Sequence, residues 1–182
     1  MRLIIASIAI LIMIAVAIPE EEQTFSYVGV DKCKMCHKTK KSGNQYELWL
    51  NGPHAKAYEV LASEQAMNIA KDLGIEDPQK SDQCLSCHVT AHAVDAKLKE
   101  ETLTMEEGVS CEQCHGPGSA YKKMTLMKDR EKAIANGLII PTEETCLQCH
   151  NENSPTYKPF KFEERVKLIA HPVPAEEEES EG

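Results

Sequence analysis

Large aromatic side chains are scarce in this 182-residue chain, which has one Trp, five Tyr and three Phe. So few large rings leave little material for a conventional apolar core, and something besides the chain is expected to fill part of the interior. An excess of basic charge is also missing, because 29 acidic residues stand against 20 basic ones and the formal net charge is −9. This balance argues against sequence-independent binding to nucleic acid, which needs a basic surface.

Apolar runs long enough for a standard membrane-spanning helix are missing too. The run from Leu3 to Ile18 would be about 24 Å long as a helix, against roughly 30 Å of bilayer hydrocarbon. Arg2 precedes this run, and Ala15-Val16-Ala17 fits the small-x-small pattern of a cleavage site. Residues 1–17 are therefore predicted to be a signal peptide for export. The alternative is an uncleaved anchor, which would be the only link to a membrane.

The C-terminal end carries Glu176 to Glu179 and Glu181 after two prolines, with no apolar residue that could stabilise a fold. Residues 173–182 are therefore predicted to be an acidic, disordered tail. Between the signal and the tail, residues 18–30 are expected to form an N-terminal extension and residues 31–172 one domain.

All eight cysteines lie in four copies of Cys-x-x-Cys-His. Zinc ribbons, disulfide staples and thioredoxin-like dithiols also use cysteine pairs, but none of them needs a His after each pair. Two cysteines three apart lie on one side of a helical turn, and the next His projects over the ring that they hold, which is the signature of c-type haem attachment. We expect four covalently bound haem c groups, attached through Cys33, Cys36, Cys84, Cys87, Cys111, Cys114, Cys146 and Cys149. The expected proximal iron ligands are His37, His88, His115 and His150.

Three further histidines, His54, His92 and His171, are candidates for distal iron ligands. Seven histidines cannot give four irons two imidazoles each, so at most three haems can be bis-His from within one chain. The fourth iron must be five-coordinate, use Met or another side chain, or take a ligand from a neighbouring subunit. If the helix of the second motif continues, His92 shares a face with His88. His92 would then serve a neighbouring haem or line a pocket.

Between the motifs the pattern is helical. Pro53 and Gly74 bound one predicted helical stretch, and Ser119 is predicted to cap a helix that runs to Asn136 and ends at Gly137. A short helix is expected over 162–170. No alternating segment of useful length predicts a strand. We therefore expect a mainly α, irregular multihaem c-type cytochrome fold, with closely packed haems and few or no strands.

The residues around the motifs resemble the tetrahaem cytochrome c-554 family over positions 28–171. The resemblance rests on Trp49, His54-Ala55-Lys56-Ala57, Cys84 to Val89, Gly108 to Gly118, Cys146 to His150 and the final Phe162-Glu163-Glu164 helix. Its most specific part is the Cys-Glu-x-Cys-His-Gly-Pro-Gly string that begins at Cys111. The resemblance implies a mainly helical, periplasmic electron carrier with stacked haem pairs.

Carried over by position, the resemblance implies that His54 is the distal ligand of the haem on His115. It implies in the same way that His171 is the distal ligand of the haem on His150. The haem on His88 would have no distal ligand from the protein.

The first haem is where this chain departs from the family. The family takes the distal His of that haem from shortly after Gly-Pro-Gly, where this chain has Tyr121, Met124 and Met127. His92 is therefore a candidate to substitute for it on the haem of His37.

Taken together, these features predict an exported, periplasmic or extracellular electron carrier that works between a redox donor and a redox acceptor, and a carrier is favoured over an enzyme. Reduction of a small molecule such as nitric oxide at an open haem is one alternative. A subunit of a larger multihaem complex, oligomer or filament is the other. The spin state of the oxidised protein separates a pure carrier from an enzyme with an open iron.

Overall fold

The computed structural model describes residues 24–171, and in this range the chain folds into short helices joined by turns. An isolated parallel bridge between Tyr27 and Lys99 is the only strand-like pairing in this range. The mainly α class is therefore confirmed. The helices, with 3₁₀ helices labelled η, are α1 (Val30–His37), η1 (Lys40–Ser42), α2 (Gln45–Leu50), η2 (His54–Lys56), η3 (Glu59–Ala62), α3 (Glu64–Asp72), α4 (Asp82–His88), η4 (Ala96–Leu98), η5 (Met105–Glu107), α5 (Cys111–His115), α6 (Met124–Met127), α7 (Arg130–Ala135), α8 (Glu143–Leu147), α9 (Phe162–Arg165) and η6 (Val166–Leu168).

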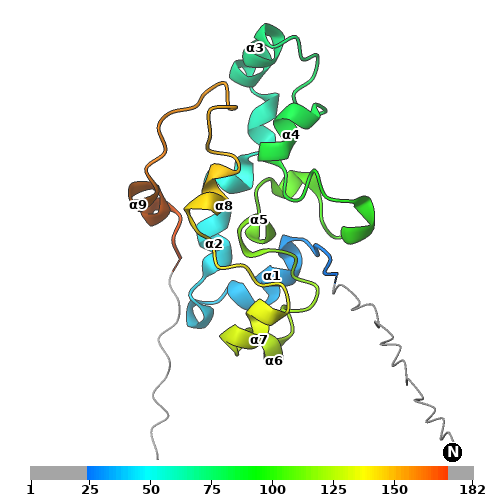
Figure 1. Cartoon of the computed structure of the whole chain (residues 1–182), viewed down its shortest axis with the longest axis vertical. Coiled ribbons are helices and arrows are strands. Elements are labelled where there is room, and N and C mark those ends of the chain that lie inside the picture. Colours follow the sequence, from blue (N-terminus) through cyan, green and yellow to red (C-terminus); the bar gives the residue numbers. More distant parts are fainter. Residues whose placement is uncertain (1–23, 172–182) are drawn as a thin grey trace, which may run out of the picture.

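The helices are spread along one long axis of the molecule. Figure 1 shows α3 and α4 at one end of this axis and α1, α6 and α7 at the other, with α2, α5 and α8 between them. Within residues 24–171, no helix is both long and apolar enough to cross a bilayer. The predicted signal peptide (1–17) and the predicted acidic tail (173–182) lie outside the described residues.

The helical stretch predicted between Pro53 and Gly74 is present but broken. Ser63 has an extended backbone and its side chain accepts a hydrogen bond from the Ala66 amide at 3.2 Å, so α3 starts anew after η2 and η3. A serine at this position satisfies an amide that the first helical turn would leave unpaired. Gly74, at φ 71°, follows the end of α3, as the sequence predicts.

The single helix predicted from Ser119 to Asn136 is wrong, because the chain forms α6 and α7 instead. Asp129 interrupts it with an extended backbone and caps α7 by accepting a hydrogen bond from the Lys132 amide at 3.1 Å. Ser119 is no helix cap, since its hydroxyl accepts from the Ser26 amide at 2.9 Å. Asp competes well for the N-cap position, so one aspartate is enough to restart a helix.

The stretch expected to be an N-terminal extension (18–30) enters the domain from Phe25 onward. The Phe25 ring packs against Gly137, where an added Cβ would lie 2.8 Å from the ring. Val28 is completely buried, and the Tyr27 amide donates to the Leu98 carbonyl at 2.8 Å. Phe25, Tyr27 and Val28 therefore pack against later parts of the described chain.

The apolar core is small. Leu61, Leu85 and Val89 form its buried cluster, with Tyr58 and Cys84 packed against it. In contrast, fifteen large apolar side chains in the described range are exposed, among them Met35, Met124 and Leu168 at 68%, 63% and 73%. A chain that leaves so much apolar surface open lacks the burial that normally stabilises a domain.

Candidate haem sites

The four motifs place their cysteines on short helices. The helices α1, α4 and α5 each carry both cysteines of a motif and end at its His, while α8 carries only Cys146 and the chain turns before Cys149. None of the eight cysteines is paired in a disulfide. Because residues three apart share a face of a helical turn, each pair is suited to hold the two edges of one flat group.

Three of the four motif histidines are oriented by a hydrogen bond at the ring nitrogen Nδ1. With a proton on Nδ1, His88 donates to the Ala57 carbonyl at 2.5 Å and His115 to the Ile139 carbonyl at 3.2 Å. His37 makes the same kind of bond to Gln45 Oε1 at 3.2 Å. The partner of Nδ1 decides the tautomer, so Nε2 carries the free lone pair that can bind a metal.

Two pairs of imidazoles lie next to each other at a separation that would admit a metal ion between them. The ring centres of His54 and His150 are 6.1 Å apart, and those of His115 and His171 are 5.9 Å apart. A metal–nitrogen bond of roughly 2 Å puts each ring centre about 3 Å from the metal, so two ligands on opposite sides lie about 6 Å apart. His150 also stacks on Phe160, with ring centres 4.8 Å apart.

Burial keeps these four histidines in the form that binds metals. It is the main cause that lowers the pKa of His54, His115, His150 and His171 below the ordinary value of histidine. The neutral imidazole, with one free lone pair, is therefore favoured.

Comparisons with known proteins all find similarity to one family. The family model described as cytochrome c554 and c-prime matches residues 32–116. Cytochrome c-554 of Nitrosomonas europaea is 33% identical over 100 residues, an alignment that covers 53% of this chain and 40% of that protein. The solved structure of reduced cytochrome c554 from Nitrosomonas europaea matches with a TM-score of 0.52 and 27% identity, over 80% of this chain and 79% of that one. The chain is therefore similar to the cytochrome c554 family.

Cytochromes c554 are tetrahaem proteins with covalently bound haem c, and the residues of this chain fit such groups. Each thiol pair is followed by an imidazole, and two pairs of imidazoles lie about 6 Å apart. The many exposed apolar side chains would be covered by flat apolar rings. The zinc, disulfide and dithiol alternatives explain none of the paired imidazoles.

The pairing of distal histidines differs from the one that the resemblance implies. His54 lies beside His150 rather than His115, and His171 lies beside His115 rather than His150. The backbone of His54 is nevertheless held near the third motif. The Val109 amide donates to the His54 carbonyl at 3.0 Å, so the segment of His54 is fixed to the chain just before α5 while its ring faces the fourth motif.

His92 does not lie on a continuation of α4, because Val89 is extended and the helix ends at His88. Its Nε2 is instead 2.8 Å from Asp82 Oδ1, in a pair at the surface. Within residues 24–171, no ring contact joins His37 or His88 to a second imidazole. After burial, the nearby His37 also lowers the pKa of His115 and of His171, so His37 is close to both without a ring contact.

Thiols of different motifs lie close together. Their positions give the order in which the four haem sites follow one another. The thiols of Cys33 and Cys111 share a hydrogen bond, and this bond is the main cause that raises the pKa of Cys33. Burial, followed by the nearby Cys146, raises the pKa of Cys114 to about 11. Burial, followed by the nearby Cys87, raises the pKa of Cys149 to about 12. The first motif thus lies next to the third motif. The third motif lies next to the fourth, and the fourth lies next to the second.

A buried carboxylate in the third motif, which the sequence analysis missed, ties the N-terminal segment to α5. Glu112 is 1% exposed, and it accepts hydrogen bonds from the amides of Val28, Gly29 and Gly118 at 2.9, 2.8 and 2.6 Å. Burial raises the pKa of Glu112 above the ordinary value, against the effect of these bonds. The sequence signal that could have revealed this carboxylate is the Glu inside the Cys-Glu-x-Cys-His-Gly-Pro-Gly string. The amide of the last Gly in that string, Gly118, is one of its three hydrogen-bond donors.

Glu107, at the end of η5, is a second buried carboxylate that was missed. It accepts hydrogen bonds from the Val30 amide at 2.8 Å and from the Ser110 hydroxyl at 2.7 Å. Burial is the main cause that raises the pKa of Glu107, and the nearby Glu112 and Asp31 act in the same direction. Together the two carboxylates fix α1 to the segment that carries the third motif.

Proposed function

We propose that this cytochrome is exported and carries single electrons between two redox proteins outside the cytoplasm. In this proposal the eight motif cysteines attach the haems, and the four motif histidines are the proximal ligands. When bound, each haem iron supplies a one-electron couple between Fe(III) and Fe(II). The chain supplies the spacing of the sites, their ligands and their shielding from water.

The observation that carries this proposal is the row of adjoining sites. The nearness of Cys33 to Cys111, of Cys114 to Cys146 and of Cys149 to Cys87 supports the order first, third, fourth, second motif. The same order follows the long axis in Figure 1, from α1 through α5 and α8 to α4. A row of sites that reaches from one end of the molecule to the other suits a carrier that receives electrons at one place and delivers them at another.

The ring geometry supports a division of the four sites into two kinds. We assign His54 with His150 and His115 with His171 as the ligand pairs of two irons. The sites of His37 and His88 would then take a sixth ligand that is not a histidine of this chain, or none. A neighbouring subunit in an oligomer is one source of such a ligand. The family relationship favours the carrier over a small-molecule reductase.

Export and domain boundaries belong to the same proposal. The signal peptide at 1–17 would direct the chain across the membrane. The acidic tail at 173–182 would follow the haem domain. Redox proteins outside the cytoplasm would then be the donor and the acceptor.

Titration of the reduced protein with carbon monoxide tests the ligand assignment, because carbon monoxide needs an open position on ferrous iron. We expect at most two equivalents per four haems in the wild type, and one more in His54→Ala. His92→Ala is the matched control and should leave the number unchanged. Pyridine haemochrome analysis must give four haems in each variant, since fewer than four in the wild type would refute the tetrahaem carrier itself. An unchanged number in His54→Ala, with unchanged spin-state spectra, would refute the role of His54.

A further inference from the structure

The folded part of the chain is close to neutral, although the whole chain is acidic. Residues 24–171 contain 19 basic and 21 acidic side chains, and the rest of the net charge of −9 comes from the two ends of the sequence. Within the folded part, however, the charges are separated along the chain.

Two segments are basic and one is strongly acidic. Residues 31–41 have five Lys and one Asp, and residues 122–132 have five basic and two acidic side chains. Residues 59–82 have six acidic side chains and two Lys. We define the basic end as Lys32, Lys34, Lys38, Lys40, Lys41, Lys122, Lys123, Lys128, Arg130 and Lys132. We define the acidic end as Glu59, Glu64, Asp72, Glu76, Asp77 and Asp82.

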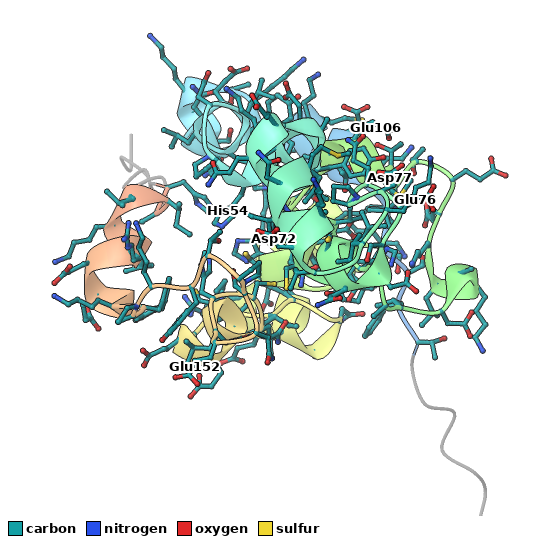
Figure 2. All side chains as sticks on the ribbon, turned by 90° about the horizontal axis from the view of Figure 1, so that it is seen from above. His54, Asp72, Glu76, Asp77, Glu106 and Glu152 are labelled. Atoms are coloured by element: carbon teal, nitrogen blue, oxygen red, sulfur yellow. The ribbon has the colours of Figure 1, made fainter. Side chains whose placement is uncertain are left out.

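The two basic segments lie at the same end of the molecule. Figure 1 shows α1, α6 and α7 together at one end of the long axis, with α3 and α4 at the opposite end. The Ser119 amide donates to the Ser26 carbonyl at 3.1 Å, which joins the chain just before each basic segment. Figure 2 looks onto the opposite end, where Asp72, Glu76 and Asp77 are labelled.

Each charged end lies beside one of the two terminal haem sites in the row of four. Lys34 lies inside the first motif, and Lys32 and Lys38 flank it. At the other end, Asp82 opens α4, the helix that ends at His88. By contrast, no lysine lies within five residues of either inner motif, on α5 or α8.

Several side chains of the basic end are exposed to solvent. Lys38, Lys40, Lys122, Lys123 and Lys128 are exposed. The ion pairs here are local, Lys34 with Asp31 at 3.9 Å and Lys132 with Asp129 at 2.7 Å, and they leave a positive excess. Charges on a protein surface are screened beyond roughly 8–10 Å in physiological salt, so the local patch, rather than the net charge, governs docking at each end.

We propose that the basic end is the docking surface for an acidic redox protein, which exchanges electrons with this cytochrome through the first haem site. This inference rests on the proposed function as an electron carrier. Complementary charge would steer the acidic partner to the basic end, and the acidic end would repel it, so the partner meets the row at one terminus. In each exchange one protein loses one electron and the other gains it, and no bond forms or breaks.

Binding of a flavodoxin, an acidic electron carrier, to the haem-loaded cytochrome tests this proposal. By calorimetry at low ionic strength, charge reversal at Lys40, Lys123 and Lys128 (each to Glu) should raise the Kd about tenfold or more. Matched reversal at the exposed Lys71, Lys158 and Lys167 should change the Kd less than about twofold. Zero-length cross-linking with a carbodiimide should join flavodoxin carboxylates to lysines of 32–41 and 122–132.

Other outcomes overturn the proposal. Equal weakening by both triple variants would show that only net charge matters. Cross-links elsewhere, or no binding by wild type that holds four haems and is reduced by dithionite, would refute the docking surface and leave the carrier function intact. Wild type without haem would instead refute the proposed function. Self-association in sedimentation that the basic-end variant abolishes would assign the surface to a second copy. Binding to phosphatidylglycerol vesicles but not to flavodoxin would assign it to a membrane.

Discussion

Around α1 and α5, separate segments of the chain are held together by hydrogen bonds to buried carboxylates. Around α4, the segments are held together by packed apolar side chains. Glu112 and Glu107 accept hydrogen bonds from backbone amides of the segment that leads into α1. Near α4, Leu61, Leu85 and Val89 pack together as the buried apolar cluster. Hydrogen bonds to a buried acceptor are directional and depend on its protonation, while apolar packing depends on volume. The two halves should therefore respond to different perturbations.

The largest loss of stability is expected from Glu112→Ala. The amides of Val28, Gly29 and Gly118 would lose their acceptor in a buried site. Buried donors left without partners cost about 1–3 kcal/mol each, so the free energy of unfolding should fall by more than about 3 kcal/mol. Denaturant unfolding of the haem-loaded protein measures this. Glu106→Ala, at an exposed position, is the control, and a similar loss in both variants would contradict the role of Glu112.

Leu85→Ala should weaken the other half. Leu85 is 4% exposed, and its truncation leaves a cavity in the apolar cluster. The expected loss is about 2–5 kcal/mol, against less than about 0.5 kcal/mol for the half-exposed Val60→Ala. In the double variant with Glu112→Ala, the two losses should add to within about 0.5 kcal/mol if the halves are independent. A larger interaction energy would show that the two halves are coupled.

A smaller effect, dependent on pH, is expected at Glu107. Because the pKa of Glu107 is raised in the folded protein, the folded state holds this proton more tightly than the unfolded chain does. Its ionisation then lowers stability as the pH rises from the ordinary pKa of glutamate to the raised one. Glu107→Gln keeps a hydrogen-bond acceptor without a charge, so it should reduce this decline. Unfolding at a series of pH values compares the two proteins, and identical pH profiles would contradict the raised pKa.

The helical class and the attachment motifs could be predicted because they depend on local chemistry. In Cys111 to His115, two sulfurs and an imidazole are placed by little more than one helical turn, and α5 covers the same five residues. Interactions within a turn are read directly from spacing. The longer helix from Ser119 was wrong because Asp129 and Ser26, rather than propensity, decided where that segment is helical.

The sequence by itself determined that the fold is mainly helical and that seven histidines cannot complete four bis-His sites, and it predicts where haem is attached. Only the tertiary structure decided that His54 faces His150, that His171 faces His115, and that the motifs adjoin in the order first, third, fourth, second. It also decided that Glu112 is buried among three amide donors. These contacts join residues far apart in the chain, and no local spacing encodes them. They arise only when the segments close on one another around shared groups.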